Sequence, residues 1–168
     1  MEAEPRSDRL RLLVAELEGE LERAGRLVAE FERARTLLAR PECEVLTVYG
    51  AAALLESYYT GAEKTLKRIA ATLGGMPSGE NWHRALLASM ALAIDGLRPA
   101  VLSAPAIAAL DPFLAFRHRF RNLYVFELER APMLTLLERG PATHDVFSAD
   151  IHAFIARLKT WIVDLDAG

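Results

Sequence analysis

Apolar residues recur every three or four positions over most of this chain, and this spacing constrains its fold more than any other feature. The clearest run lies near the N-terminus and comprises Leu10, Val14, Leu17, Leu21, Ala24, Val28 and Phe31. Such spacing places the apolar side chains along one face of an α-helix. No segment shows the apolar–polar alternation, bounded by turns, that indicates a β-strand. The sequence therefore predicts an all-α fold, an up-and-down bundle of about five helices.

Capping residues, prolines and glycines divide the chain into its helices. We expect helices over residues 7–39, 44–73, 82 to about 96–99, 103 to about 129, and 144–165. The connection between the first two is short, so they should form an antiparallel hairpin. We expect Asp111-Pro112 to kink or tightly break the fourth helix. Pro132, Gly140 and Pro141 should bracket a short helical turn before the last helix.

The composition is typical of a globular protein. With 168 residues, 52% of them hydrophobic and 26% charged, the chain is expected to form a single domain over 1–168. A net charge of −3 argues against a generally basic surface, so any contact with phosphate has to be local. The single cysteine, Cys43, excludes an internal disulfide. The polar N-terminus is not a signal peptide, and no apolar run is long enough to span a bilayer. We therefore expect a cytoplasmic protein without a membrane partner.

The residues give no sign of a metal or cofactor site. The four histidines, His83, His118, His144 and His152, show neither an HExxH motif nor the His/Cys spacing of a zinc site. A P-loop, a Gly-rich dinucleotide turn and a nucleophile elbow are also missing. The sequence therefore predicts that the protein uses neither metal nor cofactor.

The stretch 113–128 concentrates aromatic residues and positive charge that the rest of the chain lacks. Its cationic and titratable side chains are Arg117, His118, Arg119 and Arg121, and its phenylalanines are Phe113, Phe116, Phe120 and Phe126. Read as a helix, Phe113, Phe116, Phe120 and Leu123 form one apolar stripe. Arg117, Arg121 and Tyr124 follow along its flank. This arrangement predicts two guanidinium groups and a phenol held against a core.

Two interpretations of this basic stretch are open. Arginine binds phosphate through two parallel hydrogen bonds, and histidine moves protons near neutral pH. Those are the parts needed to cleave RNA without a metal, since a base takes the 2′-hydroxyl proton and arginine stabilises the developing charge. Alternatively, the arginines pair with the many glutamates of the first two helices, and the residues alone favour this alternative. Glu63 is one such candidate, and we expect it to pair with Arg117 and orient it.

Four segments resemble the HepT-like toxin group of HEPN-domain proteins. They are SYYTGAEKTLKRIA (57–70), GENWHRALL (79–87), RPAVLS (98–103) and FRHRFRNLYVFEL (116–128). The likeness extends from the first helix to the last. It implies a five-helix bundle that forms a homodimer and acts as a metal-independent ribonuclease. It also implies a toxin–antitoxin pair, in which a minimal nucleotidyltransferase (MNT) antitoxin adds adenylate to a tyrosine of the toxin.

The family signature reads Arg, four residues, His, one residue, Tyr. In this chain Arg117 matches the arginine and Tyr124 the modified tyrosine, but Asn122 stands in place of the histidine. Asparagine forms hydrogen bonds yet cannot exchange a proton near pH 7, which is expected to cost about 10²–10⁴-fold in rate. His118, one helical turn earlier, is the candidate substitute, although it is displaced by about 5–6 Å.

The resemblance therefore supports two functions. In the first, the chain is a toxin subunit with an endoribonuclease site at a dimer cleft, impaired by Asn122, with Arg119, Arg121 and Glu63 binding RNA or orienting Arg117. In the second, it is an inactive binding module that an MNT antitoxin adenylylates on Tyr124. Expected partners are RNA, the nucleotidyltransferase and a second copy of the chain, but not DNA. At the start of the third helix, we expect Trp82 in the core and His83 at the surface or in a partner contact.

Overall fold

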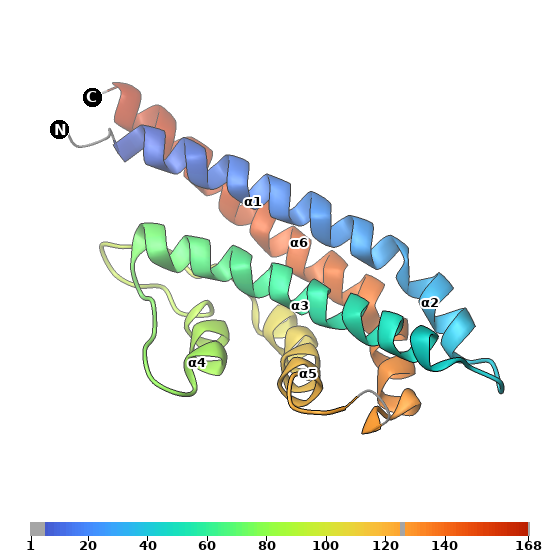
Figure 1. Cartoon of the computed structure of the whole chain (residues 1–168). Coiled ribbons are helices and arrows are strands. Elements are labelled where there is room, and N and C mark those ends of the chain that lie inside the picture. Colours follow the sequence, from blue (N-terminus) through green and yellow to red (C-terminus); the bar gives the residue numbers. More distant parts are fainter. Residues whose placement is uncertain (1–5, 125–126, 168) are drawn as a thin grey trace.

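The computed structural model describes residues 6–124 and 127–167, and the prediction of an all-α bundle is confirmed. Its helices are α1 (Arg6–Ala29), α2 (Phe31–Leu38), α3 (Val45–Leu73), α4 (Trp82–Ser89), α5 (Ala104–Phe120) and α6 (Arg130–Ala167). Only Glu30 separates α1 from α2, so these two segments form one bent rod and the bundle has five helices in all (Figure 1).

Three long helices form the body of the molecule. α1 and α6 run side by side in opposite directions, and α3 packs against both of them (Figure 1). The predicted hairpin of the first two rods is therefore present. α4 and α5 cover the other side of α3. α5 crosses α3 steeply, which is why Figure 1 shows α5 nearly end-on. This crossing brings the basic end of α5 against the middle of α3.

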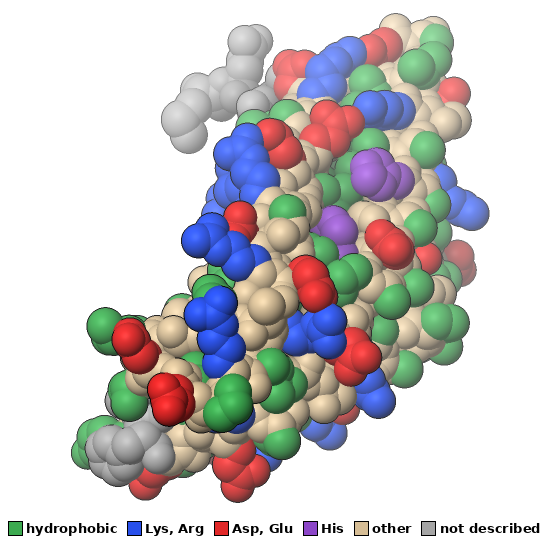
Figure 2. Space-filling view, turned by 90° about the vertical axis from the view of Figure 1, so that its right-hand side faces the viewer, with side chains coloured by type: hydrophobic (Ala, Val, Ile, Leu, Met, Phe, Trp, Pro, Cys, Tyr) green, Lys and Arg blue, Asp and Glu red, His purple; other side chains and the backbone are tan. Residues whose placement is uncertain are grey.

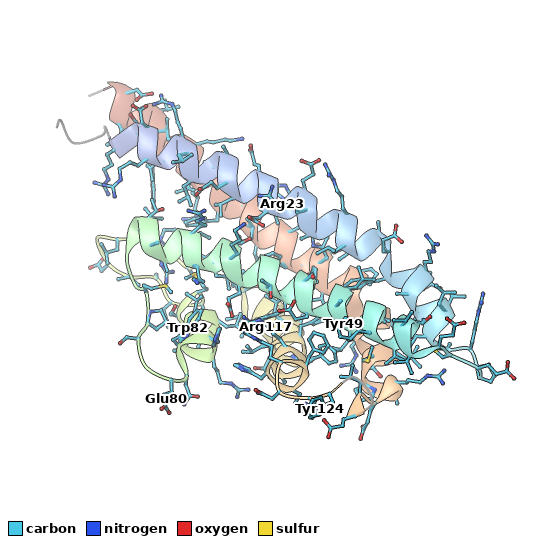
Figure 3. All side chains as sticks on the ribbon, viewed as in Figure 1. Arg23, Tyr49, Glu80, Trp82, Arg117 and Tyr124 are labelled. Atoms are coloured by element: carbon cyan, nitrogen blue, oxygen red, sulfur yellow. The ribbon has the colours of Figure 1, made fainter. Side chains whose placement is uncertain are left out.

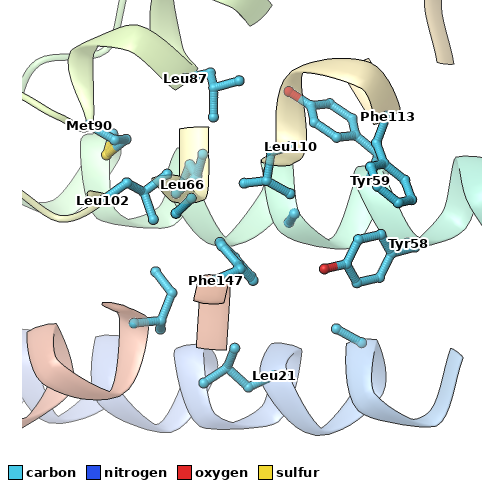
Figure 4. Packing of buried hydrophobic residues seen from close by; sticks show 14 of the residues in the cluster. Leu21, Tyr58, Tyr59, Leu66, Leu87, Met90, Leu102, Leu110, Phe113 and Phe147 are labelled. Carbon is cyan, nitrogen blue, oxygen red and sulfur yellow. The ribbon is translucent and has the colours of Figure 1, made fainter. Parts of the chain in front are cut away.

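A continuous hydrophobic core fills the space between α3 and its neighbours. Tyr58 of α3 lies at its centre, with ring centroids 5.6 Å from Phe31 and 5.3 Å from Phe113 (Figure 4). Phe147 of α6 packs into the same cluster and is fully buried. Burying one such side chain contributes about 1.5–3 kcal/mol relative to leaving it in water. The core thus fixes the position of α5 on α3.

Two predicted helices end earlier than the sequence indicates. α4 stops at Ser89 rather than near 96–99, because the guanidinium of Arg98 turns back and donates to the carbonyls of Ser89 and Leu92. α5 stops at Phe120 rather than near 129, because Asn122 folds over the last turn and its Nδ2 donates to the carbonyl of His118, 2.9 Å away. Side-chain donors of this kind satisfy carbonyls that have no partner within the helix at its end.

Two segments in which prolines were expected to kink, break or bracket a helix lie inside helices. α5 continues through Pro112, and Leu110 and Phe113 on either side of it are fully buried. α6 begins at Arg130 and continues through Pro141, so residues 132–141 belong to the last helix and do not form a separate turn before it. A proline inside a helix costs about 3 kcal/mol, and burial of the flanking apolar residues offsets that cost. No helix in the part of the chain that the structure describes is long and apolar enough to cross a membrane.

We predict that Gly140→Ala destabilises the protein by about 1–3 kcal/mol, because a methyl group at this position of α6 would overlap ring atoms of Phe31. Gly61→Ala is the matched control, since a methyl group at this position of α3 meets no neighbouring atom within 4 Å. The control should stabilise the helix by about 0.5–1 kcal/mol. Urea unfolding of both variants measures the difference, and equal midpoints would contradict this close packing of α6 on α2.

Candidate functional site

Arg117 points from α5 into the protein toward α3, where Figure 3 labels it. Its side chain is 7% exposed, and its Nε donates to the hydroxyl of Thr60 at 3.3 Å. Its Nη1 lies 3.6 Å from Oε2 of Glu63, and its Nε lies 3.8 Å from Oε1 of Glu56. The ion pair predicted between Glu63 and Arg117 is therefore present. Nη1 is buried and has no hydrogen-bond partner among the described residues.

The same oxygen of Glu63 contacts a histidine from a third helix. Oε2 lies 2.5 Å from Nδ1 of His83, and the two side chains are 7% and 16% exposed. Thus a single buried carboxylate joins α3, α4 and α5. The sequence predicted His83 at the surface or in a partner contact. The surface position is wrong, because α4 folds back against α3 and leaves only 16% of the side chain exposed, and the partner contact stays a prediction.

The loop between α3 and α4 turns the chain back, so that α4 packs against α3. Gly74 and Gly75 end α3 with φ of +89° and +90°, and Gly79 has φ of +95° shortly before α4 begins. These values lie in the region that glycine adopts at little cost. α4 then begins at Trp82, which is partly buried against the core and stacks on His83 with ring centroids 3.6 Å apart. The turn and the stack together aim His83 at Glu63.

His118 lies next to this pair on α5. Its ring meets that of His83 edge-to-face, with centroids 5.3 Å apart. Burial lowers the pKa of His118, and the neighbouring His83 and Arg117 lower it further, because each disfavours another positive charge. The lowered pKa favours the neutral imidazole, although the side chain of His118 is exposed. An imidazole in this state can accept a proton.

A groove of about 700 Å³ opens between α4 and α5 beside the two imidazoles. It is lined by Asn81, His83, Arg84, Ala85, Ala88 and His118. Arg84 stands at its rim and pairs with Asp111 of α5 at 3.5 Å. On another part of the molecule, Figure 2 shows acidic and basic side chains interspersed without a broad basic surface. On the face in Figure 2, a phosphate-containing ligand would meet no broad concentration of positive charge.

The remaining predicted site residues lie outside the cluster that Glu63, His83, Arg117 and His118 form. Asn122 is exposed and caps α5 through the carbonyl of His118. Arg119 and Arg121 are exposed as well. Tyr124 lies in the loop after α5, is 70% exposed, and donates its backbone N–H to Glu127 at 2.8 Å (Figure 3). The predicted row of Arg117, Arg121 and Tyr124 along one helix is wrong, because α5 ends at Phe120.

The apolar stripe of the basic stretch is shorter than predicted for the same reason. Phe113 and Phe116 are buried and Phe120 is partly buried, but Leu123 follows the end of α5 and is 41% exposed. Phe126 lies outside the described residues. In the ranges 6–124 and 127–167, no group of three or more histidine, cysteine, aspartate or glutamate side chains is placed to hold a metal ion.

We predict that Arg117→Met lowers the free energy of unfolding by about 3 kcal/mol, because it removes one partner from the buried pair with Glu63. Arg119→Met on the same helix is the control, since this side chain is exposed and its loss should change stability by less than about 0.5 kcal/mol. Urea unfolding followed by circular dichroism tests both. Equal stabilities of the two variants would mean that the Arg117 pair does not help to hold α5 on α3.

Comparison with known proteins identifies the family to which the chain belongs. A family model described as HepT-like protein matches residues 50–158, which include α4, α5 and every residue of the cluster. No curated protein matches the chain, and no solved structure matches it. The match covers well over half of the sequence and agrees with the all-helical bundle. The chain therefore belongs to the HepT-like family of HEPN-domain proteins.

Proposed function

We propose that this chain is the toxin subunit of a toxin–antitoxin pair and that it cleaves RNA without a metal ion, at a cleft formed with a second copy of itself. One observation carries the proposal: Arg117 is fixed by Glu63 and Thr60 next to His118, which opens on a groove. A guanidinium and a neutral imidazole at one place are the groups that phosphodiester cleavage by a 2′-hydroxyl requires.

The cleavage is slow in this proposal, because the signature histidine is absent. Asn122 cannot move a proton, and its amide already serves as a cap on α5. His118 takes the 2′-hydroxyl proton in its place, and the buried guanidinium of Arg117 lies beside it, where its positive charge stabilises the developing negative charge. A displaced base costs rate, since errors of about 1 Å in placement already reduce it strongly.

We predict that the purified protein cleaves single-stranded RNA in the presence of EDTA and that Arg117→Lys reduces the rate about 10²–10³-fold. Lysine keeps the charge but loses the planar fork of donors, so this variant is less prone to unfold than Arg117→Met. Gel analysis of end-labelled RNA measures the rate. Identical RNA decay with both proteins would remove the ribonuclease function. RNA binding should weaken steeply with salt.

A second function is favoured by the position of Tyr124. The ring is 70% exposed in the loop after α5, close in sequence to the exposed Arg121. A partner enzyme can approach such a phenol without unfolding the bundle. In this alternative the chain is a catalytically inactive module, and an MNT antitoxin transfers adenylate to Tyr124.

We predict that incubation with the partner nucleotidyltransferase and ATP adds adenylate to the chain and that Tyr124→Phe abolishes the addition. Tyr49→Phe is the matched control, because Tyr49 is also exposed, at 51%, but lies on α3. Intact-mass spectrometry gives the result. Undiminished addition to the Tyr124→Phe protein would exclude this tyrosine as the acceptor.

A further inference from the structure

We propose that His83 is a second catalytic histidine of this site, held by Glu63 as a positioning residue, and that it donates a proton to the oxygen that leaves the phosphate. The inference rests on the proposed RNA cleavage and adds a residue from a helix that the Arg–His–Tyr signature does not include. It supplies within one chain a second proton-exchanging group in a site where Asn122 has replaced the signature histidine.

The first argument is that His83 is held more tightly than an ordinary surface histidine. Glu63 contacts its Nδ1, the indole of Trp82 stacks on its face, and the ring of His118 meets it edge-to-face. Only 16% of the side chain is exposed, and it lines the groove. A ring fixed on these sides has a defined orientation, which a proton-transfer group needs.

The second argument concerns which ring nitrogen is available. An ionised carboxylate only accepts hydrogen bonds, so Nδ1 of His83 carries its hydrogen toward Glu63. Nε2 is then the nitrogen left for a substrate. When His83 is protonated, the charge of the ring lies against the carboxylate, and Nε2–H is the proton that can be given away. Carboxylate–histidine pairs in other enzymes orient the imidazole in the same manner.

The third argument is that Glu63 is placed for His83 more than for Arg117. Its Oε2 lies 2.5 Å from His83 but 3.6 Å from Arg117. Arg117 has a second carboxylate, that of Glu56 at 3.8 Å, and a hydrogen bond to Thr60. Glu56 also accepts a hydrogen bond from Thr60. If Glu63 served only to compensate the charge of Arg117, it would not need the shorter contact to His83.

The two histidines complete a balanced reaction. His118 takes the proton of the 2′-hydroxyl, and the 2′-oxygen forms a bond to phosphorus. The bond between phosphorus and the 5′-oxygen breaks, and that oxygen receives the Nε2 proton of His83. The products are a 2′,3′-cyclic phosphate and a 5′-hydroxyl. No water, metal or co-reactant enters the step, and one proton passes in total from His83 to His118.

The charged and titratable groups that surround the Trp82–His83 pair lie on three helices. They are Glu63 and Lys67 on α3, Arg84 on α4 itself, and Arg117 and His118 on α5. Glu63 is the carboxylate of this set that contacts His83 itself; Asp111 of α5 lies beside Arg84, and Glu56 of α3 lies beside Arg117. Removing the carboxylate of Glu63 takes away the charge that lies against the ring of His83.

The test makes two measurements. The first is the rate of single-turnover RNA cleavage as a function of pH. The second is the affinity for an RNA with a 2′-deoxy nucleotide at the cleavage position, which binds but lacks the attacking hydroxyl. His83→Asn should lower the cleavage rate about 10²–10⁴-fold and leave binding unchanged, because the asparagine amide keeps a donor near Glu63 but exchanges no proton. Glu63→Gln should move the alkaline limb of the pH profile to lower pH. Glu56→Gln also alters the surroundings of Arg117 but should leave that limb in place.

The outcomes separate this inference from the function on which it rests. If the unmodified protein cleaves no RNA, both fail. If it cleaves and Arg117→Lys impairs it while His83→Asn does not, only the role of His83 is overturned. A parallel loss of RNA binding in His83→Asn would make His83 a binding residue and overturn the proposal. Equal shifts in Glu63→Gln and Glu56→Gln would show that Glu63 acts through Arg117, which also contradicts it.

Discussion

One buried carboxylate holds together the half of this bundle that carries the candidate site. Glu63 contacts a histidine of α4 and an arginine of α5 through a single oxygen, so it connects the two short helices to the long α3. A buried charge without partners would cost several kcal/mol, and two cationic or titratable partners remove that cost. The position of the groove, the orientation of His83 and the burial of Arg117 all depend on this carboxylate.

Periodicity predicted the helical class and the extent of α3, because the apolar positions of that helix are regular and glycines end it. It did not predict the ends of α4 and α5. Those ends are set by the side chains of Arg98 and Asn122, which reach back to carbonyls, and such contacts leave no periodic signal. Continuation of α6 through Pro141 likewise depends on packing of the completed fold.

The site was predicted in part. The pairing of Arg117 with Glu63 followed from a polar row on the second helix and a basic row on the fourth. His83 was missed, because its contact with Glu63 spans twenty residues and a loop with three glycines of positive φ. The only sequence signal was a histidine directly after a tryptophan at a helix start. Asn122 caps the last turn of α5 through the carbonyl of His118, so the helix ends before Tyr124.

The brevity of α4 has a dynamic consequence. A helix of eight residues is not stable alone in water, so α4 stays folded only while it is docked on α3. Its docking contacts are few, and two of them, the Glu63–His83 pair and Lys67 above the Trp82 ring, involve residues around the groove. Local opening therefore dismantles the groove without unfolding α1, α3 and α6. Amide hydrogens of α4 should exchange with solvent earlier than those of the long helices, and an occupied groove should slow them.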